Sequence, residues 1–171
     1  MKQAIGSLAL LMVLALLGKA QFAYYPVNTG GVDRPDFKAH LGCASAKEVA
    51  SWLGPKMVRL RELAVILPLV VNRDHAEPLR VSPATVHLKL ASGEILDALS
   101  PEEVAAWARK VGVPKLPHPE VLTGIEVKKG EAGGFAAVFR LPKGANASRV
   151  EAEMRLSLGA DEALQVKTTL Y

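Results

Sequence analysis

The sequence predicts a mainly β protein, an antiparallel β-sandwich of immunoglobulin-like type with about seven or eight strands. Two observations carry this prediction. Apolar and polar residues alternate with a period of two along several segments, most clearly over residues 150–158. Glycine, proline and other turn formers separate these segments at intervals of roughly 8–14 residues. A small closed barrel is the alternative arrangement of the same strands.

Residues 1–20 have the pattern of a secretory signal peptide. Lys2 precedes an uncharged apolar run over residues 4–17, and small residues stand just before Gln21. The run is shorter than the roughly 20 apolar residues that a membrane-spanning helix needs, although an uncleaved anchor is the alternative. We therefore expect an exported protein, located in the periplasm or at the cell surface, with no stable membrane span after cleavage.

The rest of the chain has the length of one domain, about 150 of the 171 residues. Residues 21–43 contain turn formers without a sustained period, which predicts an exposed, extended arm. Residues 44–171 are then the single sandwich domain.

Two short helices are predicted within this domain. The first, at about 45–53, begins with a capping box formed by Ser45 and Glu48 and ends at a Gly-Pro pair. The second, at about 101–111, begins after Ser100 with a proline in its first turn and ends at a glycine. Its apolar residues recur at helical spacing.

The first long β-segment is predicted from Met57. Val58 and Leu60 alternate with arginines, and the odd-numbered residues of 63–71 continue the alternation in a shifted phase. The phase shift predicts a bulge or break at residues 61–62. Pro68 cannot donate a ladder hydrogen bond, so it predicts a bulge or a sheet edge.

Alternation and turn signals predict the remaining strands at 79–82, 86–90 with 94–96 as a hairpin, 121–128, 135–141, 150–158 and 164–170, with an extended, proline-rich connector at 112–120. In the strand at 150–158 the inward residues are Val150, Ala152, Met154, Leu156 and Leu158, and the outward ones Arg149, Glu151, Glu153 and Arg155.

Charge and cysteine content exclude several classes of protein. The net charge is +4, the basic residues are scattered among acidic ones, and aromatic residues make up only 5%, which does not fit a nucleic-acid-binding face. Cys43 is the only cysteine, so no internal disulfide can form. It lies too far from the apolar leader to be a lipid attachment site.

No catalytic pattern is present. The chain lacks a Gly-x-Ser-x-Gly motif, and Cys43 with His40 lies in a segment without regular structure. The carboxylate pairs at 102–103 and 161–162 are explained by a helix start and a turn. The glycine-rich loop at 130–134 has no helix after it, so it is not a phosphate-binding loop. The sequence therefore predicts a non-enzymatic protein without catalytic or cofactor-binding residues.

The histidines do not predict a metal site. His40, His75, His87 and His118 are not spaced as ligand pairs. A copper site could be drawn from His87, Met57, Met154 and Cys43, but nothing in the spacing selects it, and the methionines suit core positions. We expect no metal and no cofactor.

Several stretches resemble bacterial exported immunoglobulin-like β-sandwich domains. One runs through residues 69–72, 77–81 and 88–94, where a strand ends in asparagine and a later strand ends in a glycine turn. The other is residues 139–142 with 150–158, which resemble the closing strand pair of such domains. The resemblance covers about residues 63–170. It implies the fold and no defined activity.

The absence of recognisable chemistry predicts an accessory module of the cell envelope that binds a protein or surface partner. The segments at 21–43 and 112–120 are the expected contact elements. The alternative is a periplasmic carrier of a small ligand or metal.

Overall fold

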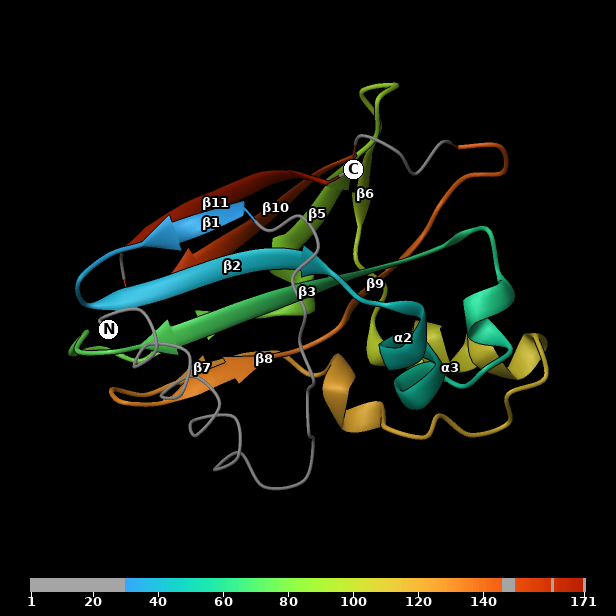
Figure 1. The fold of residues 1–171 in the computed structure, drawn as a ribbon, viewed down its shortest axis with the longest axis horizontal. Helices are drawn as coiled ribbons and strands as arrows, with labels where there is room; N and C mark the ends of the chain where they lie inside the picture. The colour runs from blue at the N-terminus through green and yellow to red at the C-terminus, as the bar shows by residue number, and fades with distance from the viewer. Residues whose placement is uncertain (1–29, 146–149, 161, 171) are drawn as a thin grey trace, which may run out of the picture.

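The computed structural model describes residues 30–145, 150–160 and 162–170, which form two antiparallel β-sheets and two α-helices (Figure 1). The leader predicted at 1–20 lies outside these ranges. Sheet A consists of β1 (Gly30–Asp33), β2 (Phe37–Cys43), β3 (Leu63–Asn72), β8 (Ala132–Gly134) and β9 (Ala137–Arg140). Sheet B consists of β4 (Leu79–Val81), β5 (Val86–Lys89), β6 (Ile95–Asp97), β7 (Ile125–Val127), β10 (Val150–Ser157) and β11 (Ala163–Leu170). The helices are α2 (Ala46–Leu53) and α3 (Pro101–Lys110).

The mainly β sandwich with two short helices is confirmed. Sheet A has the order β1-β2-β3-β8, and β9 pairs with β3 beside β8. Sheet B has the order β6-β5-β10-β4-β7, and β11 pairs with the other edge of β10. The described residues contain eleven strands instead of the expected seven or eight, partly because long segments are divided into shorter strands.

The core between the sheets follows the predicted alternation. Ala152, Met154 and Leu156 of β10 are fully buried, whereas Glu151 and Arg155, which alternate with the buried residues, are exposed. Phe139 of β9 is also fully buried and belongs to the same hydrophobic cluster. β10 therefore contributes one apolar face to the sandwich, as its period of two requires.

A second core lies on the other face of sheet A, beneath α2 and α3. Val65 and Leu67 of β3 pack there with Trp52 of α2 and Trp107 of α3. Because β3 is covered on both faces, its apolar residues do not reveal which face meets sheet B. The alternation of the odd-numbered residues therefore did not fix the face: Ile66 and Val70 enter the sandwich core, whereas Val65 and Leu67 pack beneath the helices.

The expected strand at Met57 is also wrong. Met57–Arg59 forms a 3-10 helix, η1, in which the N–H of Leu60 donates to the carbonyl of Met57. Met57 is fully buried in the core under the helices. The predicted break is confirmed, since β3 begins at Leu63.

The expected arm is a hairpin in its described part. β1 and β2 pair with each other, and β2 pairs with β3 along its whole length. Phe37, Ala39 and Leu41 alternate along β2 and are fully buried in the sandwich core. The short alternation was hidden by the glycines and prolines around it, and pairing with β3 stabilises it.

Pro68 lies inside β3, opposite Leu41 of β2. Its carbonyl accepts a hydrogen bond from the N–H of Phe135, at 3.3 Å, so the proline nitrogen also faces the β8–β9 side. On that side the ladder is interrupted between β8 and β9. The bulge or sheet edge predicted for Pro68 is wrong, because β3 lies between β2 and β8–β9 and keeps one register with both β8 and β9.

Both helices begin where the capping patterns predict. Ser45 and Glu48 form a reciprocal capping box at α2, and Ser100 and Glu103 form one at α3. Each box satisfies two backbone N–H groups that a helix start leaves unpaired. Gly54 ends α2 with φ +96°, a backbone conformation that L side chains rarely adopt.

The connector after α3 is held against the helices. Leu116 is buried, and the N–H of His118 donates to the carbonyl of Trp52 in α2. A strand was expected at 121–128, but its first part is a 3-10 helix, η3 (Pro119–Leu122), and only β7 is strand. Leu122 is buried in the core beneath the helices, which explains the apolar residues at this point.

Candidate interaction surface

The outer face of sheet B carries the charged side chains of its strands, whereas the outer face of sheet A is partly covered by helices. Because strand side chains alternate, the residues between the buried ones of β5 and β10 point outward. Lys89 pairs with Glu151 at 3.3 Å, and Lys167 of β11 pairs with Glu153 at 3.0 Å. The result is a surface of mixed charge with cross-strand ion pairs.

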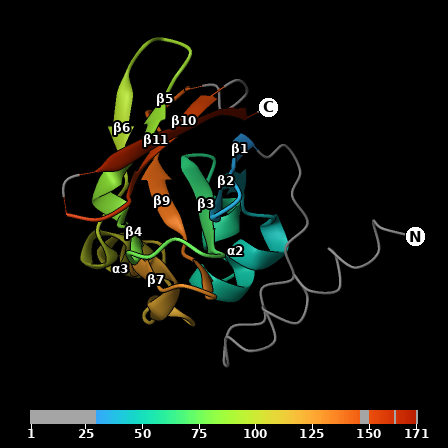
Figure 2. The ribbon, with the colours of Figure 1, turned by 90° about the vertical axis from the view of Figure 1, so that its left-hand side faces the viewer.

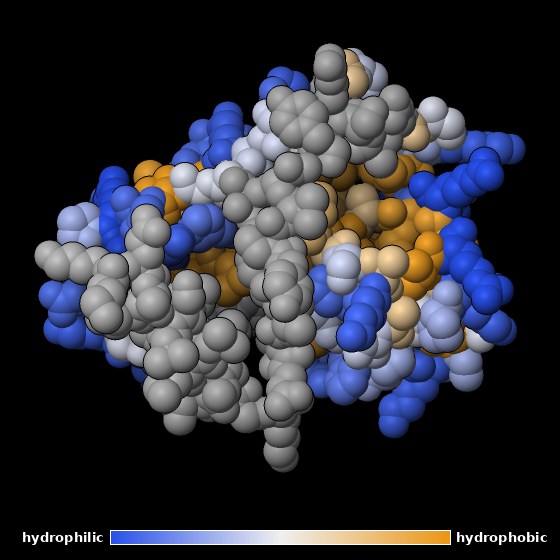
Figure 3. Space-filling view, in the orientation of Figure 1, coloured by the Kyte–Doolittle hydropathy of each residue, from blue (hydrophilic) through white to orange (hydrophobic). Residues whose placement is uncertain are grey.

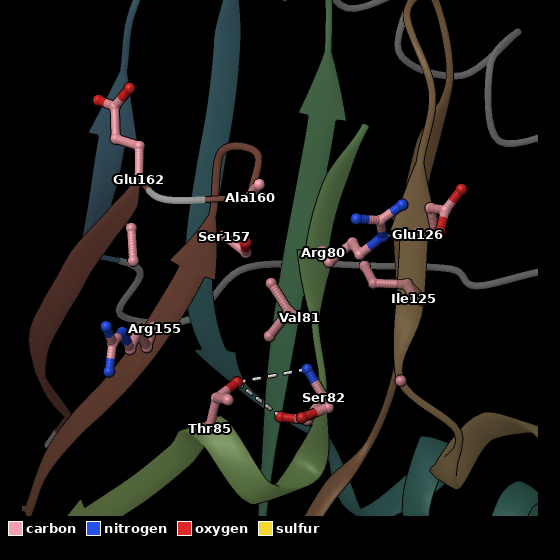
Figure 4. A pocket seen from close by; sticks show the side chains of 12 residues that line it. Arg80, Val81, Ser82, Thr85, Ile125, Glu126, Arg155, Ser157, Ala160 and Glu162 are labelled. Atoms are coloured by element: carbon pink, nitrogen blue, oxygen red, sulfur yellow. Dashed lines mark hydrogen bonds and ion pairs between the residues drawn. The ribbon is translucent and has the colours of Figure 1, made fainter. Parts of the chain in front are cut away.

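One hollow on this face is a groove of about 670 Å³ between β4, β7 and the adjoining ends of β10 and β11 (Figure 4). A 3-10 turn, η2 (Pro83–Thr85), separates β4 from β5, so that only Ser157 of β10 pairs with β4. The groove is lined by Arg80, Val81, Ser82, Thr85, Gly124, Ile125, Glu126, Arg155, Ser157, Ala160, Glu162 and Ala163.

The groove has charged side chains at both margins. Arg80 donates to Glu126 at 2.7 Å, and this hydrogen bond lowers the pKa of Glu126. Arg155 and Glu162 lie on the opposite margin, as Figure 4 shows. The hydroxyl of Thr85 donates to the carbonyl of Ser82 at 2.9 Å, which holds the turn between the margins. Such a groove suits a polar, extended ligand with charges of both signs.

A smaller hollow of about 250 Å³ lies beside the β5–β6 hairpin and is lined partly by Ile95, His87 and Lys89. Ile95 is 64% exposed and is the only exposed large hydrophobic residue among the described ones. The hairpin projects from the sandwich in both ribbon views (Figures 1 and 2). His87 is held on the hairpin by Asp97, at 2.8 Å.

The outer edge of β6 has no partner strand among the described residues. The N–H of Leu90 donates to the carbonyl of Glu94, and the register pairs Leu88 with Leu96. In an antiparallel ladder this register points the backbone groups of Ile95 away from β5. In the described part of the chain, no other strand pairs with β6.

The other sheet margins lie against neighbouring strands. A side chain at Gly30 of β1 would overlap Thr168 of β11, so these two edges meet across the sandwich. A Cβ atom at Gly133 of β8 would lie 3.2 Å from Val127 of β7. These contacts place β1 against β11 and β8 against β7, whereas the outer edge of β6 pairs with no described strand.

The side of the molecule shown in Figure 3 also has a hydrophobic area, away from the β5–β6 hairpin. Hydrophobic residues gather there near η1 and the start of β3, beside a hydrophilic rim. Val58 of η1, Leu60 after it and Leu63 at the start of β3 are half-buried and pack against the core beneath the helices. They form the margin of that core.

The structure does not bring together the four residues from which a copper site could be drawn. Met57 belongs to the core beneath the helices, Met154 to the core between the sheets, and His87 to the outer face of sheet B. Cys43 lies at the margin of the sandwich core. Across residues 30–145, 150–160 and 162–170, no three His, Cys, Asp or Glu residues are placed to hold a metal ion.

Cys43 and His40 cannot act as a pair, because residues three apart on β2 point to opposite faces. Burial raises the pKa of the Cys43 thiol, which disfavours the reactive thiolate. Burial also lowers the pKa of His40.

The other residues considered in the sequence lie apart from this strand. His118 pairs with Glu120 at 2.9 Å on the connector, and Glu103 belongs to a capping box. Asp161 lies outside the described residues.

Sequence reasoning missed the environment of His75, which contacts Asp36 at 2.9 Å and the Leu158 carbonyl at 3.0 Å. The three residues are far apart in the chain, so no local pattern indicated their meeting.

In the described ranges, no helix is both long and apolar enough to cross a bilayer. The leader region is not among those ranges.

No protein-family model matches the chain, and no curated protein matches its sequence. Two solved bacterial structures are similar to it. The yjhA protein from Bacillus subtilis has 7% identity and a TM-score of 0.41, over 72% of this chain and 76% of that one. A DUF4426 family protein from Pseudomonas aeruginosa PAO1 has 12% identity and a TM-score of 0.42, over 84% of this chain and 93% of that one. These similarities say nothing about what the chain does.

Proposed function

We propose that this protein is a non-enzymatic accessory module of the cell envelope that binds a protein partner through the β5–β6 hairpin. The observation that carries the proposal is the exposed side chain of Ile95, on a projecting hairpin whose outer edge no described strand covers. Exposed hydrophobic residues within a polar surround are typical of protein-binding sites, and a free edge can accept an added strand.

The surroundings of Ile95 favour a partner segment with a hydrophobic side chain between polar ones. Lys89 pairs with Ile95 across the hairpin and lies beside Glu151, so both signs of charge are within reach of a bound segment. Mixed charge around a hydrophobic anchor gives orientation and specificity more than affinity. The sequence favoured the arm and the connector as contact elements; residues 30–43 of the arm pair within sheet A, and the connector buries Leu116 while Lys115 is exposed.

Export is part of the proposal and rests on the leader at residues 1–20. The module would then act in the periplasm or at the cell surface. The immunoglobulin-like subclass of the sandwich is also part of the proposal, supported by the spacing of turns in the sequence and by the two antiparallel sheets.

A second candidate function is a carrier of a small ligand. The groove between β4, β7 and β10 supports it, because its volume of about 670 Å³ lies within the range of small-molecule sites, roughly 300–1,000 Å³. Ligand- or metal-induced shifts in melting temperature would favour the carrier.

The experiment that tests the protein-binding proposal places a photoreactive side chain at position 95 or, as a control, at the exposed Lys115 of the connector. In the native host, position 95 should crosslink to one envelope protein that position 115 does not reach. That protein, once purified, should bind the wild type and Lys115→Glu but not Ile95→Asp. Equal crosslinking from both positions, or binding by Ile95→Asp, would contradict the proposal.

A further inference from the structure

Three segments that are distant in sequence meet around His75. Its Nδ1 lies 2.9 Å from the carboxylate of Asp36, in the turn between β1 and β2, 39 residues away. Its Nε2 lies 3.0 Å from the carbonyl of Leu158, at the end of β10, 83 residues away. The imidazole thus connects the turn of sheet A with the end of a strand of sheet B.

The contacts around the ring fix its position. The backbone N–H of His75 donates to the side-chain carbonyl of Asn72 at 2.9 Å. The ring packs against Phe37 in an edge arrangement, with 6.0 Å between ring centroids. The carbonyl of Asp36 accepts the N–H of Arg73 at 2.8 Å, so the loop that carries His75 is also attached to the β1–β2 turn. His75 is therefore held in place on three sides.

The two partners of the ring determine its protonation. A carbonyl oxygen can only accept, so Nε2 must carry a proton to bond Leu158. An ionised carboxylate also only accepts, so Nδ1 must carry a proton to bond Asp36. Both hydrogen bonds form together only when His75 is the imidazolium cation. When the ring is neutral, only one of its two nitrogens carries a proton, so one of the two hydrogen bonds is lost.

The charges around the site favour this cation. The hydrogen bond to Leu158 raises the pKa of His75, burial opposes the rise, and Asp36 and Glu162 add to it. Burial of Asp36 raises the pKa of its carboxyl, but the hydrogen bond from His75 and the nearby Arg34 lower it overall. Glu77 also lies near this site, since a Cβ atom placed on Gly159, the residue after Leu158, would be 3.6 Å from the Glu77 side chain.

The end of β10 also builds part of the large groove. Ser157 precedes Leu158, and Ala160 and Glu162 follow it; all three line the groove. We propose that His75 is a protonation-dependent latch that holds the end of β10 against the β1–β2 turn and thereby fixes one wall of this groove.

The direction of the pH dependence follows from the two groups. The contribution of His75 is fully present below its unfolded value of about 6.5 and is lost as the pH rises through its higher folded pKa. The contribution of Asp36 is present above its unfolded value of 3.8 and is lost as the pH falls through its lower folded pKa. The latch is therefore closed in mildly acidic solution and opens as the pH rises above the folded-state pKa of His75.

The first test needs no variant. Nitrogen-15 NMR of the wild-type imidazole should show both ring nitrogens protonated at pH 5.5 and a titration midpoint above 6.5. Hydrogen exchange at Leu158 and Ala160 should become faster as the pH rises through that midpoint, after correction for the intrinsic pH dependence of exchange. A midpoint at or below the ordinary value, or corrected exchange independent of pH, would overturn the latch.

The second test compares variants between pH 5.5 and 8.5. His75→Gln should remove part of the pH dependence of the melting temperature and speed exchange at Leu158 already at pH 5.5. Asp36→Asn should also reduce the pH dependence of the melting temperature and speed exchange at Leu158. It replaces His75→Gln in the comparison if that variant does not fold. The control His118→Gln removes a histidine that also contacts a carboxylate, and it should leave exchange at Leu158 unchanged. Equal behaviour of the His75 and His118 variants would refute the proposal.

Discussion

The carboxamide of Asn72 donates a hydrogen bond to the carbonyl of Val127, 3.2 Å away, and so joins the last residue of β3 in sheet A to β7 in sheet B. Asn72 is fully buried and is the only buried polar side chain in the described part of the chain. It donates a second, longer hydrogen bond to the Glu77 carbonyl and accepts one from the N–H of His75. The asparagine at the end of this strand thus organises the whole loop that follows.

We expect Asn72→Ala to lower the free energy of unfolding by about 1–3 kcal/mol, because buried hydrogen-bonding groups lose their partner. Asn72→Asp should cost more, since a buried carboxylate would face two carbonyl oxygens. Urea denaturation followed by circular dichroism measures both effects. Thr169→Ala, on the exposed face of β11, is the control and should change little. An Asn72→Ala protein as stable as this control would show that the bridge between the sheets is dispensable.

The two faces of β10 should respond very differently to truncation. Leu156→Ala should cost about 2–5 kcal/mol, through lost transfer energy and the cavity left behind, and Phe139→Ala about 3–5 kcal/mol. Glu153→Ala and Arg155→Ala on the outer face should cost less than about 1 kcal/mol. Thermal and denaturant unfolding of the four variants provides the comparison. Similar losses for Leu156→Ala and Glu153→Ala would be incompatible with the described register.

Arg140 connects β9 to α3 through the ring of Trp107, with its guanidinium carbon 5.3 Å from the ring centroid. Its Nε also donates to Glu62 at 3.2 Å. Trp107→Ala should destabilise the protein by about 3–5 kcal/mol, because the ring is buried beneath sheet A. Arg140→Lys should cost less than 1 kcal/mol or so, since the pair with Glu62 is exposed. Calorimetric melting of both variants separates the buried ring from the surface charge, and equal effects would contradict this assignment.

The exposed histidines should be dispensable for stability. His87→Ala and His118→Ala each remove a contact with an exposed carboxylate, and such changes are usually within about 0.5 kcal/mol. Melting temperatures and metal analysis of the purified variants test this. A fall of several degrees together with loss of bound copper or zinc would instead indicate a metal site.

Export predicts a shortened N-terminus. If residues 1–20 are a leader, the mature protein isolated from its native host should begin near Gln21. N-terminal sequencing or intact mass measures this directly. An intact Met1 in protein that only detergent extracts would indicate an uncleaved anchor.

Several features of the fold were predictable because their signals are local. The capping boxes at Ser45 and Ser100 lie within one helical turn, and both helices begin at the expected residues. The alternation in β10 is clear because one face is buried and the other meets water. The β5–β6 hairpin was predictable for the same reason, together with its glycine turn.

The candidate surface was predictable only in part. The sequence placed His87 and Lys89 on an outward face, but it did not single out Ile95 or the groove beside Arg155. Exposure of Ile95 depends on how far the hairpin projects, and the groove depends on η2 separating β4 from β5. Both are consequences of how distant segments pack.

By itself, therefore, the sequence determined the class of the fold, the starts of both helices and the faces of the strands that have water on one side. Only the tertiary structure decided the phase of β3, the incorporation of residues 30–43 into sheet A, and the meeting of Asp36, His75 and Leu158. The physical reason is the same in each case. A strand buried on both faces shows no polar alternation, and contacts between residues far apart in the chain leave no local pattern.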